Sequence, residues 1–185
     1  MDQTSREKRK ENVIEVLNKA RAMELQAISQ YMNQHYNLSD MDYGDMAAKV
    51  KLIAIDEMRH AEMFAERIKE LDGEPTADLA AKVVRGQDVR SVFSFDTALE
   101  DDTIDAYNRF LHTCRENGDN TSLKIFELVI DEEQIHLNYF VSVNSHVEKL
   151  GDTYLAQIAG TPSSTGIQAR GFIAAQGGGT GGAGA

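Results

Sequence analysis

A set of acidic, histidine and tyrosine residues occurs twice in the sequence with the same spacing. In each copy a glutamate precedes a tyrosine by seven residues, and a Glu-x-x-His motif begins 33 residues after that glutamate. Repeated spacing of this kind indicates an internal repeat rather than chance. The two copies are offset by 76 residues, and the corresponding pairs are Glu24 and Glu100, Tyr31 and Tyr107, Glu57 and Glu133, and His60 and His136.

The acidic and histidine residues of the repeat interrupt apolar stripes of helical spacing. At about 100° per residue, the two groups of a Glu-x-x-His motif lie on adjoining turns of one helix face. Glu57 and His60, for example, lie between Ile53 and Phe64. We therefore expect all six residues to point into one helical core.

Four carboxylates in one apolar core need compensating charge, because burial strongly disfavours the ionised form. Two divalent cations would supply it, with one glutamate and one histidine on each ion and two glutamates bridging the pair. Oxygen and imidazole ligands suit iron or manganese, and six protein ligands leave positions open for oxygen species. The same ligand pattern is known from di-iron carboxylate bundles. Tyr31 and Tyr107 have two interpretations, since each could either hydrogen-bond a carboxylate or serve a redox role.

The positions of turn residues predict the helices that must carry these groups. The chain has only two prolines, Pro75 and Pro162, so its long apolar stripes can be helical throughout. The pattern predicts helices at about residues 6–37, 42–71, 96–117, 121–150 and 152–159. Residues 73–95 are predicted to form a long crossover connection between the second and third helices. The predicted fold is all-α: a four-helix bundle with a crossover and a short fifth helix in residues 1–160, followed by a flexible glycine-rich tail in residues 161–185.

Composition excludes several other classes of protein. The 185 residues carry 30 acidic and 19 basic side chains, a net charge of −11, which argues against nucleic-acid binding. No apolar run is long enough to span a membrane, and the polar N-terminus lacks the apolar stretch of a signal peptide. A single cysteine, Cys114, excludes a disulfide framework and is expected to be a buried thiol. We therefore expect a cytoplasmic protein.

Four stretches of the chain resemble the bacterioferritin family. They are MELQAISQY (23–31), IDEMRHAE (55–62), DEEQIH (131–136) and LGDTYLAQ (150–157). The resemblance covers about residues 10–160 and implies a ferritin-like fold. It also implies a ferroxidase centre with two Fe ions per subunit, bridged by Glu57 and Glu133. The full ligand set implied by the resemblance is Glu24, Glu57, His60, Glu100, Glu133 and His136.

The resemblance also assigns a role to Met58, which lies between the glutamate and histidine of the first Glu-x-x-His motif. By itself a methionine at this position is usually a packing residue. The family resemblance implies that it is an axial haem ligand, shared with its copy on a two-fold partner. It further implies a hollow shell of 24 subunits, with a small ferredoxin as an electron donor.

Iron storage with Fe(II) oxidation by O2 or H2O2 is the function that these features favour. An alternative is a ferritin-like peroxidase or dimanganese catalase without storage. Rubrerythrin-type peroxidases carry an iron module held by four cysteines, which a chain with one cysteine cannot form. Two non-enzymatic alternatives are a haem-carrying bundle, against which the repeated Glu/His motif argues, and a DNA-protecting shell, against which the acidic charge argues.

Overall fold

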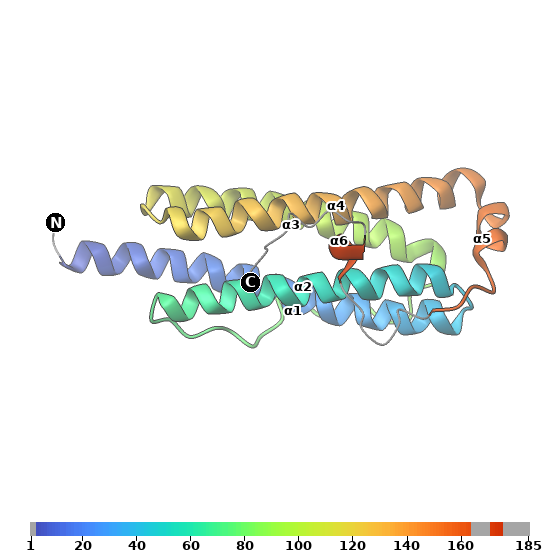
Figure 1. The fold of residues 1–185 in the computed structure, drawn as a ribbon, viewed down its shortest axis with the longest axis horizontal. Helices are drawn as coiled ribbons and strands as arrows, with labels where there is room; N and C mark the ends of the chain where they lie inside the picture. Colours follow the sequence, from blue (N-terminus) through green and yellow to red (C-terminus); the bar gives the residue numbers. More distant parts are fainter. Residues whose placement is uncertain (1–2, 164–170, 176–185) are drawn as a thin grey trace, which may run out of the picture.

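Four long helices and two short ones make up the described part of the chain. A computed structural model describes residues 3–163 and 171–175. The helices run in the order α1 (Gln3–Asp40), α2 (Gly44–Glu70), α3 (Val89–Glu116), α4 (Asn120–Leu150), α5 (Asp152–Ile158) and α6 (Phe172–Ala175). Figure 1 shows the long helices side by side, with α1 and α2 forming one hairpin and α3 and α4 the other. The prediction of an all-α bundle with a short fifth helix is confirmed.

The crossover between α2 and α3 returns along the length of the bundle, so that α3 begins at the end where α2 begins (Figure 1). Side chains of α1 hold it in place. The Gln30 side chain accepts from the Val84 amide at 2.8 Å and donates to the Val84 carbonyl at 2.9 Å. Asn18 accepts from the Thr76 amide at 2.7 Å. These bonds satisfy backbone groups in a segment that has no helix of its own.

Helix α3 begins seven residues earlier than the sequence pattern predicted. The Asp88 side chain caps it by accepting from the amides of Arg90 and Ser91, both at 3.0 Å. Val92 and Phe93 in the added turns are fully buried. The crossover is correspondingly shorter than the predicted 73–95, because an aspartate cap and this apolar pair extend the helix.

The bundle core is divided into two apolar clusters. One contains Leu38, Val147 and Leu155, at the end of the bundle where α5 lies. The other contains Val13, Cys114 and Phe126, towards the opposite end. Cys114 is buried, as expected, and burial raises the pKa of its thiol to about 12. The buried acidic and histidine residues belong to neither cluster.

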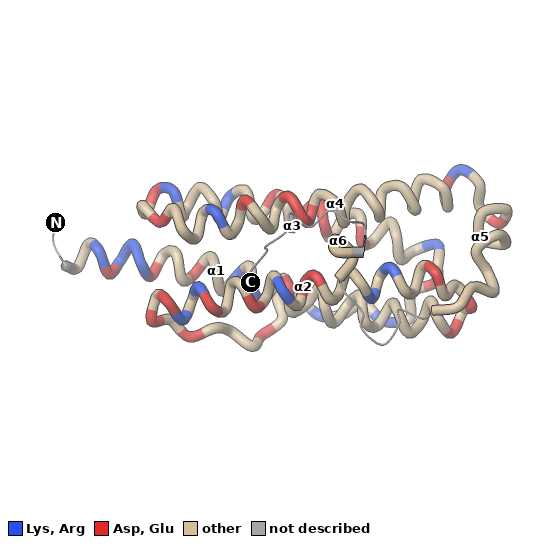
Figure 2. Tube along the Cα trace, in the orientation of Figure 1, with Lys and Arg blue, Asp and Glu red and all other residues tan. Residues whose placement is uncertain are grey.

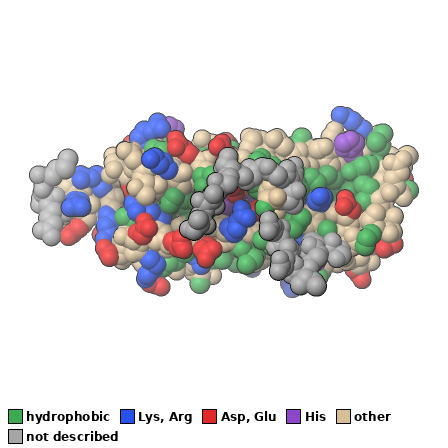
Figure 3. Space-filling model, in the orientation of Figure 1, with side chains coloured by type: hydrophobic (Ala, Val, Ile, Leu, Met, Phe, Trp, Pro, Cys, Tyr) green, Lys and Arg blue, Asp and Glu red, His purple; other side chains and the backbone are tan. Residues whose placement is uncertain are grey.

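Charged side chains of both signs cover the outside of the bundle. Figure 2 shows acidic residues on all four long helices, and Figure 3 shows acidic and basic side chains interspersed on one face of the molecule. Within the described ranges, no helix is both long and apolar enough to cross a membrane.

The C-terminal segment differs from the predicted flexible tail where the structure describes it. Phe172 and Ile173 are 1% and 3% exposed and form part of the first apolar cluster. Both are bulky apolar residues in a sequence otherwise dominated by small and polar ones. Removing their apolar surface from water stabilises the packed position of this segment. The remaining tail residues, 164–170 and 176–185, lie outside the described residues.

Candidate metal centre

All six predicted ligand residues meet at one buried site in the bundle. Each long helix contributes: α1 and α3 supply one glutamate each, and α2 and α4 each supply a Glu-x-x-His motif. None of these side chains is more than 2% exposed. They are Glu24 on α1, Glu57 and His60 on α2, Glu100 on α3, and Glu133 and His136 on α4.

The six residues divide into two overlapping groups of four. In each group, one ligand atom from every residue lies within 4.8 Å of the others. Glu57 and Glu133 belong to both groups. One group adds Glu24 and His60, and the other group adds Glu100 and His136. Two ions at these positions would share Glu57 and Glu133, the pair that the family resemblance implies as bridging ligands.

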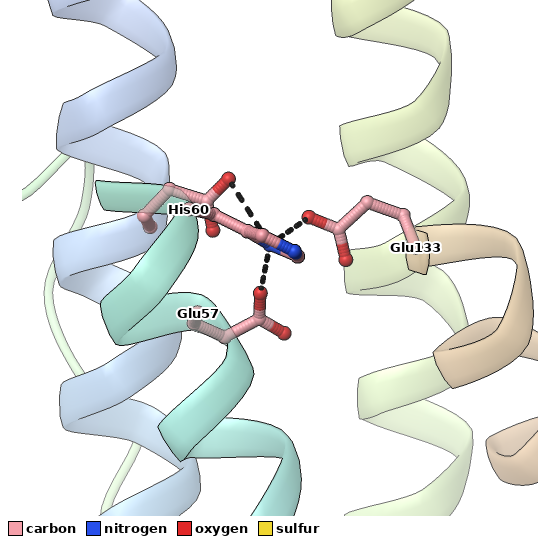
Figure 4. Close-up of side chains that lie close together, drawn as sticks. Glu57, His60 and Glu133 are labelled. Atoms are coloured by element: carbon pink, nitrogen blue, oxygen red, sulfur yellow. Dashed lines mark hydrogen bonds and ion pairs between the residues drawn. The ribbon is translucent and has the colours of Figure 1, made fainter. Parts of the chain in front are cut away.

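Both histidines present Nδ1 to the carboxylates. Figure 4 shows the His60 ring between the carboxylates of Glu57 and Glu133. Its Nδ1 lies 2.9 Å from Glu57 Oε2 and 3.2 Å from Glu133 Oε1. His136 Nδ1 lies 3.1 Å from Glu133 Oε2 and 3.2 Å from Glu57 Oε1. The two imidazoles therefore face the same pair of glutamates from opposite sequence repeats.

The two tyrosines of the repeat hydrogen-bond the two unshared glutamates. Tyr31 donates to Glu100 Oε1 at 2.5 Å, and Tyr107 donates to Glu24 Oε1. Each tyrosine serves the glutamate of the other repeat. These are the hydrogen bonds that the first of the two interpretations of these residues requires, and they leave the redox role untested.

Two further carboxylates, which the sequence analysis missed, contact the outer nitrogen of each histidine. Glu132 Oε2 is hydrogen-bonded to His60 Nε2 at 2.8 Å, whereas Asp56 Oδ2 lies 3.5 Å from His136 Nε2, which has no hydrogen-bond partner among the described residues. A carboxylate in this position orients a metal-binding imidazole and increases its basicity. The signal was available in the sequence, because Asp56 and Glu132 are also offset by 76 residues and each precedes a bridging glutamate.

Comparison with known proteins agrees with this geometry. The sequence model of the ferritin family, described as a ferritin-like domain, matches residues 14–150. The bacterioferritin of Desulfovibrio desulfuricans is 63% identical over 171 residues, which are 92% of this chain and 96% of that protein. The chain belongs to the bacterioferritin family.

Solved structures of other bacterioferritins have the same fold. The D. desulfuricans structure, described as showing the diiron site in different catalytic states, has a TM-score of 0.87 at 63% identity and covers 91% of this chain and 98% of that one. The Rhodobacter capsulatus bacterioferritin, described with a metal-free dinuclear site and a haem iron in a crystallographic special position, has a TM-score of 0.77 at 32% identity. That match covers 83% of this chain and 96% of that one.

Burial and mutual repulsion determine the protonation of this bacterioferritin site when no metal is bound. Burial raises the pKa of Glu24 and of Glu100 well above the ordinary value, and the charges of Glu133 and Glu57 raise both further. Burial alone would lower the pKa of the two histidines, but the surrounding carboxylates raise it well above its ordinary value. Protons thus supply the compensating charge that two divalent ions would otherwise bring.

The donor set fits two divalent ions. Among the described residues, six buried side-chain atoms have no hydrogen-bond partner, and two of them are Glu57 Oε1 and Glu133 Oε1, each of which faces a histidine Nδ1 at 3.2 Å. Buried polar atoms of this kind are rare in native proteins unless they bind an ion or water. Both atoms belong to the two glutamates that the four-residue groups share, which is where bridging between two ions requires free oxygen atoms.

Met58 lies outside the metal centre on the surface of α2. It is 55% exposed and faces a shallow groove of about 500 Å³. Leu25, Ile28 and Ile55 form apolar parts of the groove, which is also lined by the charged residues Arg21, Arg59 and Glu62. The structure thus places Met58 apart from the six ligand residues, in a setting that is apolar but exposed on the single chain.

We predict that Tyr107→Phe and Tyr31→Phe each destabilise the metal-free protein by about 1–3 kcal/mol, because each leaves a buried carboxyl group without its donor. Denaturant unfolding of chelator-treated protein measures the change. Tyr36→Phe is the matched control, since the Tyr36 ring is 64% exposed. Losses no larger than that of the control would show that the tyrosine hydroxyls do not stabilise the carboxyl groups.

We also predict that the metal-free protein becomes less stable as pH rises above about 6.5. Glu24, Glu100 and both histidines have raised pKa values in the folded chain, so the native state retains protons that the unfolded chain releases. The contribution of the histidines is fully present below their unfolded pKa and is lost as pH rises through the folded pKa. The raised glutamate pKa values act in the same direction, and their contribution is lost from the unfolded glutamate pKa of 4.5 upward.

Thermal unfolding at a series of pH values tests this dependence. Protein saturated with Zn(II), a redox-inert ion, provides the comparison, because metal ligands must release their protons and metal binding strengthens with pH. We expect the melting temperature of the metal-free protein to fall with pH and the difference between the two forms to widen. A metal-free melting temperature that is constant or rises with pH would contradict the prediction.

Proposed function

We propose that this bacterioferritin stores iron and oxidises Fe(II) to Fe(III) at the buried centre. The observation that carries the proposal is the pair of overlapping four-residue groups, which share Glu57 and Glu133 within one bundle. The donor set is carboxylate and imidazole, which suits iron. The related D. desulfuricans protein, described with a diiron site, supports the same assignment for this chain.

In this proposal Fe(II) is the substrate, and each of two ions takes one unshared glutamate and one histidine. Glu24 and His60 hold one ion, Glu100 and His136 hold the other, and two glutamates bridge them. Two Fe(II) ions give one electron each to an acceptor. O2 takes these two electrons and two protons to leave as H2O2, whereas H2O2 takes two electrons and two protons to leave as two water molecules.

The chain's own residues prepare the centre for this reaction. Binding of the two ions displaces protons from the buried glutamates and histidines, since only the deprotonated groups bind metal. Tyr31 and Tyr107 orient the two unshared carboxylates, and Glu132 and Asp56 orient the two imidazoles. The helices thereby hold six donors in place while the charge on each ion increases.

Storage requires an assembled shell, and family membership implies a homo-oligomer. We propose 24 subunits, a cytoplasmic location and a small ferredoxin as the electron donor for iron release. Of the 30 acidic residues, four lie in the metal centre, which leaves 26 against 19 basic residues. This surplus of acidic residues would attract Fe(II) to the assembled protein.

We also propose that Met58 is an axial ligand of a haem shared by two subunits. Its exposure in an apolar groove suits a flat apolar group that a second copy of the chain would cover. A thioether is an established axial ligand for haem iron. The R. capsulatus relative, with its haem iron in a crystallographic special position, supports a haem on a symmetry axis between two copies. When bound, the haem supplies one-electron transfer.

We predict that Glu24→Ala and His136→Ala each slow rapid Fe(II) oxidation by at least about 100-fold, because each removes a direct ligand from one ion. Stopped-flow absorbance after addition of Fe(II) in air measures the rate. His112→Ala, on an exposed position of α3, is the control. Unchanged oxidation in both ligand variants would refute the ferroxidase assignment.

We predict that Met58→Leu abolishes haem binding while the protein still oxidises Fe(II), because Met58 lies outside the six-residue centre. Leucine preserves apolar volume but removes the thioether. The measurement is the visible absorption spectrum of the purified protein, combined with the Fe(II) oxidation rate. Normal haem content in this variant would show that the haem ligand lies elsewhere.

A further inference from the structure

The outer face of the metal centre is covered on one side by the C-terminal segment. Residues Gly171–Ile173, here called the strap, lie against α2 and α4 near the middle of the bundle (Figure 1). The Ile173 amide donates to Asp56 Oδ2 at 2.9 Å. The Phe172 ring lies 6.1 Å from the ring of His136 and 5.0 Å from that of Tyr139, between ring centroids.

Gly171 brings the strap backbone directly against the Asp56 carboxylate. A Cβ atom at this position would lie 1.7 Å from Asp56 Oδ1, a distance that no side chain could occupy. Asp56 is completely buried as a result, with the strap on one side and Arg59 Nη2 at 3.2 Å. The oxygen that accepts from the Ile173 amide, Oδ2, is also the one that lies 3.5 Å from His136 Nε2.

The corresponding carboxylate of the other repeat is less covered by the described residues. Glu132 contacts His60 Nε2 at 2.8 Å, but its side chain is 22% exposed. Arg59 Nη2 lies 3.9 Å from Glu132 and closer to Asp56, so it interacts with both outer carboxylates. The two halves of the centre repeat the same ligands, yet in the part of the chain that the structure describes one outer carboxylate is fully buried and the other is partly exposed.

We propose that the strap makes the two metal positions unequal by sealing Asp56 and fixing it as the positioning residue of His136. The His60 position exchanges its ion readily on the side of Glu132. The His136 position holds its ion longer, because release there requires the strap to move. This inference rests on the proposed function, since it assumes that the six residues bind two ions.

Metal release distinguishes the two positions without relying on oxidation. Assembled protein loaded with Co(II) is mixed with excess EDTA, and the loss of the visible Co(II) absorption is followed by stopped flow. We expect two phases of equal amplitude in the unaltered chain. Ile173→Pro removes the amide donor, and Gly171→Val places a side chain where Asp56 lies. Each should accelerate the slow phase by at least about tenfold and leave the fast phase unchanged.

Three further variants separate a positioning role from general stabilisation. Ala174→Ser changes an exposed residue of the same turn and should leave both phases unchanged. Glu132→Gln should accelerate only the fast phase, because its partner is His60. Phe172→Ser releases the strap without proline or a clash and repeats the test if either other strap variant fails to assemble. A segment that only stabilised the fold would shift both phases together.

The outcomes identify which statement is wrong. Fewer than two Co(II) ions per unaltered chain would overturn the proposed metal centre and this inference with it. Two ions released in one phase would overturn the inequality of the positions while leaving the metal centre intact. Two phases that respond to Glu132→Gln but not to the strap variants would overturn the role of the strap alone.

Discussion

The need to neutralise four carboxylates inside an apolar bundle governs the rest of this structure. Burial of an ionised carboxylate without a partner is so unfavourable that the fold must provide protons, donors or cations for each one. The helices provide tyrosine hydroxyls for the two unshared glutamates and imidazoles for the two shared ones. These tyrosine and histidine groups stabilise the buried carboxylates in the metal-free chain, and the same contacts hold the carboxylates in position to bind metal.

This requirement also explains why the core consists of two apolar clusters rather than one. The polar site adds little apolar contact, so stability must come from Leu38, Val147 and their neighbours at one end and from Val13, Phe126 and theirs at the other. The crossover adds support through Gln30 and Asn18. A rigid bundle on both sides of the centre keeps six donors at fixed separation.

Much of the fold and all six predicted members of the site could be recognised in the sequence. The three-residue spacing of Glu57 and His60 is a local property of the sequence, and helical geometry places both side chains on one face; the 76-residue repeat of the motif shows that a second helix carries the same pair. The predicted start of α3 was wrong by seven residues, because the pattern did not reveal that Asp88 caps the helix and that Val92 and Phe93 pack in its first turns. The strap was missed for a different reason. Composition describes a segment as a whole, whereas the packing of Phe172 depends on a distant partner, Tyr139, that no local pattern reveals.

The exchange of tyrosines between the repeats has a consequence for the internal symmetry of the fold. Tyr31 bonds the glutamate of the second half, and Tyr107 bonds the glutamate of the first. A single half folded alone would leave its own carboxylate without a hydroxyl donor. Two separate copies of that half, related by a two-fold axis, would satisfy both. The interaction pattern is therefore that of a symmetric dimer of helical hairpins joined into one polypeptide by the crossover, in which the two halves differ at Asp56 and Glu132.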